Sequence, residues 1–188
     1  MADANEEIVK LWLEGEGYAV ETCVQFTSQK GTKGGAGPSD IDILAIFRKQ
    51  GKTPPYGRRL LIQVKGWFNF GKKLKKTIKP VKQYYSSWLS KAAVKCAGGY
   101  FGTKKFKTIK TMWVQPLAED SQGHRQKLKC LFGKLKKGNK ISKAVDHIID
   151  FKAVLNQVFK SVDKGTDYKG KPILQAFRLI KIYTKKEE

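Results

Sequence analysis

The sequence predicts a mixed α/β fold with a central β-sheet flanked by helices. Three observations support this class: a helical pattern opens the chain, two apolar strand patterns follow, and helical patterns return near the end. The chain has 188 residues, 40% of them hydrophobic, and can bury one sizeable core without disulfides. We therefore expect one compact domain, with residues 1–120 as the core and residues 121–188 as a basic extension packed on it.

The first strand-forming part of the chain follows a helix. Apolar residues at helical spacing predict a helix over residues 4–15, which ends at nearby glycines. Residues 18–26 are rich in β-forming side chains and predict a strand, and residues 27–39 predict a loop of Gly, Lys and Ser. Residues 40–48 are apolar on both faces, as expected for a central strand covered on both sides.

A turn with two prolines leads from that strand into a strand over residues 58–67, and a connection of this length predicts an antiparallel hairpin. Residues 81–95 then predict a helix that ends at Gly98 and Gly99. We expect further strands over residues 100–103 and 108–115.

The last third of the chain gives fewer signals. The Lys-rich region at residues 122–143 predicts no definite element. Residues 151–162 predict a helix, and a second helix opened by Pro172 follows, because its apolar residues recur at helical spacing.

The charge balance predicts a polyanionic partner. Lys and Arg number 38 against 16 Asp and Glu, which gives a net charge of +22 and strong self-repulsion. Nucleic acid, DNA before RNA, is the expected partner. An anionic membrane is the alternative, but the basic residues are spread over many segments instead of one amphipathic helix.

The cysteines and the apolar stretches indicate where in the cell the protein is expected. Cys23, Cys96 and Cys130 are odd in number and far apart, so they predict neither a disulfide framework nor a zinc knuckle. No stretch reaches the roughly 18 apolar residues of a membrane span. We expect a cytoplasmic protein with reduced thiols and no membrane partner.

Three polar residues within the apolar strands form a candidate site. Asp42 lies in one strand, while Gln63 and Lys65 share a face of the next strand because side chains alternate. If the two strands pair, these side chains can converge on one metal ion. Phosphodiester hydrolysis uses such an ion together with a positive side chain near the phosphate.

These residues carry a resemblance to a known family. The order of elements resembles the core of the PD-(D/E)XK nucleases, above all Mrr-type restriction endonucleases and archaeal Holliday-junction resolvases. This order is a helix, a strand, the segment DIDILA, a hairpin and the segment LIQVKG. Asp42 matches the Asp of the first motif, and Gln63 with Lys65 matches the second motif in its QxK form. Glu6 matches a helix carboxylate ahead of a GY pair, and Gly98–Thr103 (GGYFGT) resembles the strand after the next helix.

The resemblance implies a restriction-endonuclease-like core and a metal-dependent endodeoxyribonuclease. Asp42, Gln63 and Glu6, with the carbonyl of Val64, would hold Mg²⁺ or Mn²⁺, and Lys65 would orient the water or steady the phosphate. If both strands or a symmetrical junction are cut, a homodimer is expected, because two-fold substrates are matched by two-fold proteins.

Each site residue also has a structural explanation. Asp42 could hydrogen-bond a strand end, Lys65 could be solvated, and Glu6 could simply favour the start of its helix. Asp40 is either a second ligand or an exposed residue at the start of its strand. Because Gln63 stands in place of an acid, a nucleic-acid-binding protein that has kept the fold and lost catalysis is the alternative function.

The expected DNA contacts combine cations for phosphates with aromatic rings for bases. They are Lys30, Lys33, Trp67, Phe68, Lys72, Lys73, Lys75 and Lys76. A second group, Lys104, Lys105, Lys107 and Lys110, is expected to add only general surface charge.

Overall fold

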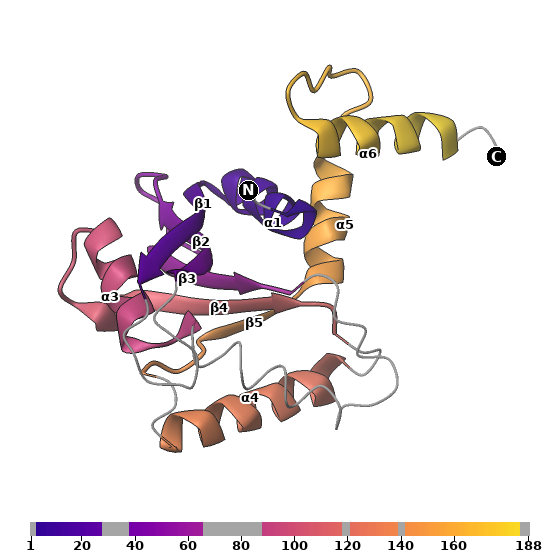
Figure 1. The fold of residues 1–188 in the computed structure, drawn as a ribbon. Coiled ribbons are helices and arrows are strands. Elements are labelled where there is room, and N and C mark those ends of the chain that lie inside the picture. Colours follow the sequence, from indigo (N-terminus) through magenta and orange to yellow (C-terminus); the bar gives the residue numbers. More distant parts are fainter. Residues whose placement is uncertain (1–2, 28–37, 66–87, 118–120, 139–141, 185–188) are drawn as a thin grey trace.

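The computed structural model describes residues 3–27, 38–65, 88–117, 121–138 and 142–184. Within them a five-stranded mixed sheet is covered by helices on both faces (Figure 1). The predicted α/β class, with a central mixed sheet flanked by helices, is confirmed.

The strands lie side by side in chain order. They are β1 (Tyr18–Thr27), β2 (Pro38–Phe47), β3 (Arg59–Val64), β4 (Ile109–Gln115) and β5 (His147–Asp150). Strand β2 pairs antiparallel with both β1 and β3, whereas β4 pairs parallel with both β3 and β5. The predicted antiparallel hairpin of β2 and β3 is therefore confirmed.

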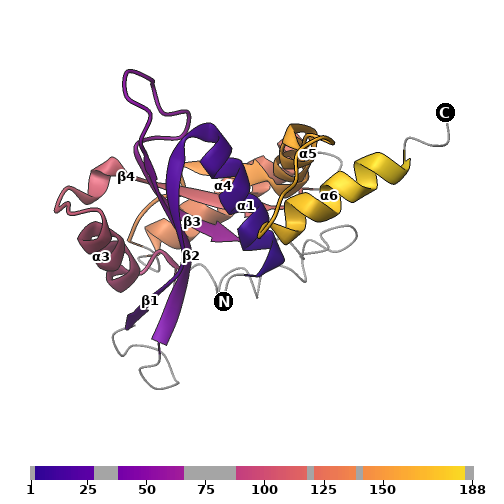
Figure 2. The same ribbon diagram turned by 90° about the horizontal axis from the view of Figure 1, so that it is seen from above.

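The helices divide between the two faces of the sheet. Side chains of α1 (Ala4–Glu16) and α5 (Phe151–Ser161) share one core with one face, whereas those of α3 (Lys91–Tyr100) and α4 (Ser121–Lys137) share the other. The last helix, α6 (Pro172–Tyr183), adds Leu174 to the first core and then projects away from the sheet (Figure 2).

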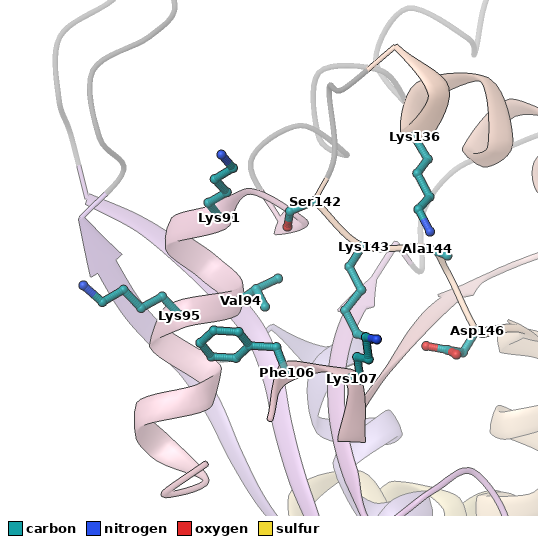
Figure 3. A pocket seen from close by; sticks show the side chains of 10 residues that line it. All are labelled: Lys91, Val94, Lys95, Phe106, Lys107, Lys136, Ser142, Lys143, Ala144 and Asp146. Atoms are coloured by element: carbon teal, nitrogen blue, oxygen red, sulfur yellow. The ribbon is translucent and has the colours of Figure 1, made fainter. Parts of the chain in front are cut away.

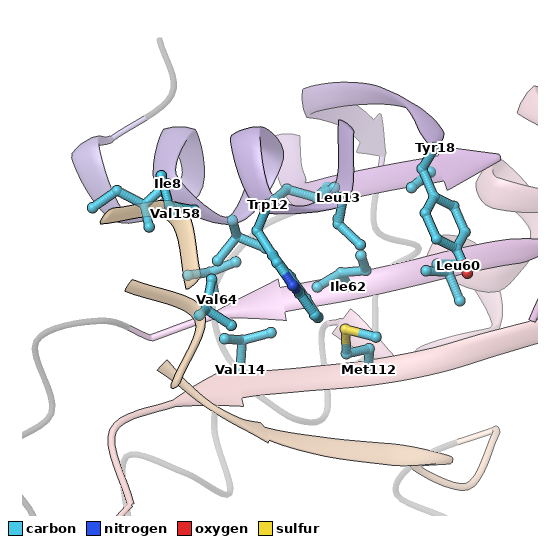
Figure 4. Packing of buried hydrophobic residues seen from close by; sticks show 14 of the residues in the cluster. Ile8, Trp12, Leu13, Tyr18, Leu60, Ile62, Val64, Met112, Val114 and Val158 are labelled. Carbon is cyan, nitrogen blue, oxygen red and sulfur yellow. The ribbon is translucent and has the colours of Figure 1, made fainter. Parts of the chain in front are cut away.

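Helix α1 is fixed at both ends and along one face. The Asp3 side chain accepts from the main-chain N–H of Glu6, while the Glu6 side chain accepts from that of Asp3, which forms a capping box. Gly17 ends the helix with a φ of 102°, a conformation that glycine adopts readily. Trp12 and Leu13 pack onto β3 and β4 (Figure 4). These restraints determine where Glu6 lies.

The prediction for residues 81–103 was right in its described part for residues 91–95, which are helical, and wrong around them. Ser90 caps the start of α3, so no continuous helix runs to residue 95, and Gly98 and Gly99 lie inside α3. The N–H of Thr103 donates to the carbonyl of Gly98 at 2.9 Å, which closes a turn at residues 101–103 where a strand was expected. Tertiary packing has overridden the usual helix-ending role of glycine.

Two elements in the last third were missed. Helix α4 buries Leu128, Phe132 and Leu135, which recur at spacings of four and three, but lysines dominate its sequence. The short strand β5 pairs with β4 and leads directly into α5, whose N-cap is Asp150.

The thiols of Cys23, Cys96 and Cys130 are free, as expected. Among the described helices, none has the length and apolar character that crossing a bilayer requires.

Candidate active site

The hairpin of β2 and β3 brings Asp42 and Gln63 together at the end of its paired stretch. Ile43 pairs with Ile62, so Asp42 and Gln63 are the next residues along the two strands. Both residues are buried, and as whole residues Asp42 is 8% and Gln63 5% exposed. Two polar side chains therefore meet inside an otherwise apolar part of the sheet.

One oxygen of Asp42 is the centre of the site. Its Oδ2 accepts from the Gln63 side-chain amide, from the main-chain N–H of Val64 at 2.7 Å, and from the Lys65 ammonium at 3.3 Å. The Lys65 and Asp42 side chains are only 13% and 10% exposed. The three residues predicted to converge are thus in direct contact.

Burial is the dominant influence on the Asp42 carboxyl. It raises the pKa, and the opposing effects of the Lys65 charge and of the hydrogen bonds from Val64, Lys65 and Gln63 do not restore the ordinary value. The folded chain therefore disfavours the charged carboxylate, and additional positive charge at Asp42 would favour it.

Glu6 lies near this centre from the first turn of α1. Its Oε2 accepts from the Asp3 N–H at 3.3 Å and from Cys23 Sγ at 3.4 Å. Burial raises the pKa of Glu6, and the charge of Asp42 raises it further. Glu6 therefore both caps its helix and belongs to the electrostatic surroundings of Asp42.

Cys23 is a part of the site that the sequence did not indicate. It stands across from Asp42 in the β1–β2 pair, between the pairs Thr22 with Ile43 and Val24 with Ile41. Its φ of 54° is the only positive value among the described non-glycine residues. Such conformations collect at functional sites, where the surrounding fold holds them in place.

Strand β2 changes its facing at this point. Ile41 packs in the core with α3, whereas Ile43, two residues on, packs in the core with α1. Regular alternation would place both on one face. The irregularity at Cys23 and the change of facing at Asp42 mark the same position in two neighbouring strands.

The oxygen atoms near Asp42 suit a hard cation. The described residues contain no group of three or more His, Cys, Asp or Glu side chains arranged to hold a metal. The candidate donors are instead the carboxylates of Asp42 and Glu6, to which the sequence motif would add the amide oxygen of Gln63 and the carbonyl of Val64. Mg²⁺ prefers oxygen ligands and commonly takes only one or two carboxylates from the protein. The charge of Asp42 raises the pKa of Glu6, and a cation near both carboxylates would relieve this repulsion.

Of the other residues predicted for the site, the structure describes only Asp40. Asp40 is exposed at the start of β2. Lys30, Lys33, Trp67, Phe68, Lys72, Lys73, Lys75 and Lys76, the predicted DNA contacts, lie outside the described residues.

Comparison with known proteins adds no assignment: no protein-family model, no curated protein and no solved structure matches this chain. The candidate site therefore rests on its own residues and their geometry.

Proposed function

We propose that this protein is a metal-dependent endonuclease that hydrolyses phosphodiester bonds in DNA, with Asp42, Gln63, Lys65 and Glu6 as its active centre. The restriction-endonuclease-like fold suggested by the sequence motifs is part of this proposal. Mg²⁺ or Mn²⁺ is the cofactor that the oxygen ligands suit best.

The buried contact between Asp42 and Lys65 is the observation that carries the proposal. The Nζ atom of Lys65 and the Oδ2 atom of Asp42 lie 3.3 Å apart, and both side chains are nearly buried. The carboxylate of Glu6 belongs to the same electrostatic surroundings. Burying a charge is costly unless it is paired or binds a metal, so this arrangement favours a function.

Each residue has a distinct role. Asp42 and Glu6 supply negative charge for the cation, and Gln63 and Val64 supply neutral oxygens. The bound cation lowers the pKa of a water and neutralises charge on the phosphate. Lys65 holds the attacking water or a phosphate oxygen, which its position beside Asp42 allows.

The competing proposal is a nucleic-acid-binding protein without catalysis. One observation favours it: three donors already satisfy Oδ2 of Asp42 without any cation. To bind the cation, the side-chain amide of Gln63 must turn, because its nitrogen and not its oxygen now faces Asp42. The second oxygen, Oδ1, receives no hydrogen bond from the described residues and remains for a cation.

The partner follows from charge. A net charge of +22 attracts a polyanion, and DNA is the proposed substrate. A homodimer remains a prediction, and light scattering of the purified protein tests it. The exposed apolar side chains of Leu179, Ile180 and Tyr183 on α6 are where a second copy would first be sought.

Incubation with labelled nucleic acids tests the proposal. Duplex, single-stranded and four-way-junction DNA, and a matched RNA, are each exposed to the protein with Mg²⁺, Mn²⁺ or EDTA. The nuclease predicts internal cuts in at least one DNA with metal and none in EDTA. Binding without cleavage under every condition supports the competing proposal.

A further inference from the structure

A lysine-rich pocket of about 640 Å³ lies between α3, the segment that precedes β5, and the short 3-10 helix η1 (Phe106–Thr108) (Figure 3). Pockets of this size commonly bind small molecules or single groups of larger ligands. Its lining has an apolar part and a cationic part. Phe106 contributes to the apolar part, and the cationic part consists of Lys91, Lys95, Lys107, Lys136 and Lys143.

One acid stands against the five lysines of this pocket, and it already has other partners. Asp146 is the one acid in the lining, and its carboxylate accepts from Lys110 Nζ at 3.1 Å and from the Thr111 N–H at 2.9 Å. Within the described residues, none of the five lining lysines forms an ion pair. Lys136 reaches from α4 toward the segment that carries Lys143 (Figure 3).

The excess of positive charge in the pocket affects Lys143. Burial lowers the pKa of its ammonium group; Asp146 raises it, and the charges of Lys110 and Lys136 lower it again. An anion in the pocket would offset both the burial and the repulsion. The charge of the pocket is therefore complementary to phosphate.

Phe106 supplies an aromatic surface beside these cations. Phe106 as a residue is 40% exposed, although its ring also packs on α3. It lies over Gly98, where an added Cβ would come within 2.3 Å of the ring atom Cε1. The missing side chain at Gly98 thus lets the ring approach α3 while one part of it stays open.

This pocket and the Asp42 site lie at opposite ends of the sheet. Ile109 follows η1 and pairs with Arg59 at the start of β3, whereas Gln63 pairs with Trp113 near the end. Four residues of strand separate these two pairs by roughly 13 Å. A ligand in the pocket does not occupy the Asp42 site.

We propose that the pocket binds an unpaired nucleotide of a single-stranded nucleic acid, with its phosphates on Lys107, Lys136 and Lys143 and its base on Phe106. Cations that follow the phosphates and an aromatic ring that stacks on a base are the usual combination for single strands. A duplex offers phosphates, but its bases are already stacked. The net charge of +22 favours a polyanionic strand over a free nucleotide.

Lysine footprinting tests the position of the strand. The protein, in EDTA, is acetylated with a succinimidyl ester in the presence of an oligothymidylate of about eight nucleotides, and mass spectrometry measures each lysine. We expect lower modification of Lys107, Lys136 and Lys143, with Lys152 and Lys160 on α5 unchanged. A duplex of the same length, a nucleoside triphosphate and inorganic tripolyphosphate serve as comparison ligands.

Variants test the base and phosphate contacts separately. Phe106→Ala should weaken single-strand affinity about 5- to 150-fold, the range for one lost stacking contact. Tyr100→Ala, which removes an aromatic side chain from a residue that is 47% exposed and outside the pocket lining, should change it less than about twofold. Lys107→Gln with Lys143→Gln should reduce the log–log salt slope by about 1.4, and Lys152→Gln with Lys160→Gln by less.

Phe106→Leu preserves apolar packing over Gly98 and removes only the ring, so it replaces the alanine variant if that one fails to fold. Three results would overturn the proposal: no protection of the pocket lysines by the oligothymidylate, equal protection by duplex or tripolyphosphate, or unchanged affinity in both Phe106 variants. Because every measurement is made in EDTA, these results do not depend on cleavage at Asp42.

Discussion

The main-chain N–H of Val64 donates to Oδ2 of Asp42 at 2.7 Å, so the backbone of β3 itself holds the carboxylate. A side chain fixed in this way keeps its position when its other partners change. Substitutions of Gln63 or Lys65 should therefore alter the chemistry of the site more than its geometry.

Asp42→Asn should leave the fold intact and improve its stability or leave it unchanged. Burial raises the pKa of Asp42, which means that the folded chain is penalised for the charge, and a neutral side chain of the same shape removes that penalty. Thermal unfolding in EDTA at neutral pH measures this. A drop in the melting temperature of more than about 5 °C would make Asp42 a structural residue.

The same variant should bind DNA at least as tightly as the wild type. It removes a negative charge close to the expected phosphate position. Fluorescence anisotropy in EDTA, with a labelled duplex, gives the comparison. Clearly weaker binding would place Asp42 among the groups that hold DNA instead of metal.

Lys65→Ala should reduce cleavage by at least about 100-fold, the scale of losing one group that stabilises transition-state charge. The free energy of unfolding should change by no more than about 1 kcal/mol, because Val64 and Gln63 still donate to Asp42. Single-turnover cleavage and urea unfolding measure the two effects. A large loss of stability with normal cleavage would identify a structural lysine.

Gln63 decides how tightly the site holds its metal. An amide oxygen can bind a cation but brings no charge, so Gln63→Glu should lower the Mg²⁺ concentration for half-maximal cleavage and Gln63→Ala should raise it. Magnesium titrations of the three proteins provide the test. Identical metal requirements would remove Gln63 from the active site.

Asp146→Asn should destabilise the junction of β4 and β5 by about 1 kcal/mol at neutral pH. Burial raises the pKa of Asp146, but hydrogen bonds from Thr111 and Lys110 outweigh it, so the pKa lies below its usual value. A lowered pKa contributes stability above the unfolded value of about 3.9, and this is lost as the pH falls through the folded value.

Urea unfolding of wild type and Asp146→Asn at pH 7 and pH 3 measures this dependence. The difference between the two proteins should shrink at the lower pH. Asp40→Asn, an exposed change on β2, is the control and should alter stability little at either pH. An undiminished difference at pH 3 would attribute the effect to packing instead of charge.

The sequence was sufficient to predict the part of the fold that carries the site. The strands β2 and β3 were recognisable because residues 40–48 are apolar on both faces and a turn with two prolines leads into the next strand pattern. Their pairing then follows, and with it the meeting of Asp42 and Gln63. The apolar pattern of neighbouring residues is enough to predict a strand where that pattern is strong.

Other features depend on contacts between distant residues. The positive φ of Cys23 is set by the strands and helix around it, and no residue type there signals it. Gly98 lies within α3 where the helix packs closely against Phe106, a contact that local propensity cannot anticipate. The lysines of α4 hid an apolar stripe of only three buried side chains.

Comparing the cleavage rates of wild type and Asp42→Asn, with Asp40→Asn as the matched control, tests the proposed function most directly. All three proteins are incubated with the same labelled DNA in Mg²⁺, Mn²⁺ and EDTA. We predict metal-dependent cuts by wild type and Asp40→Asn, and none above background by Asp42→Asn despite undiminished binding. Equal cleavage by Asp42→Asn, or binding without cleavage by wild type in either metal, would contradict the proposal.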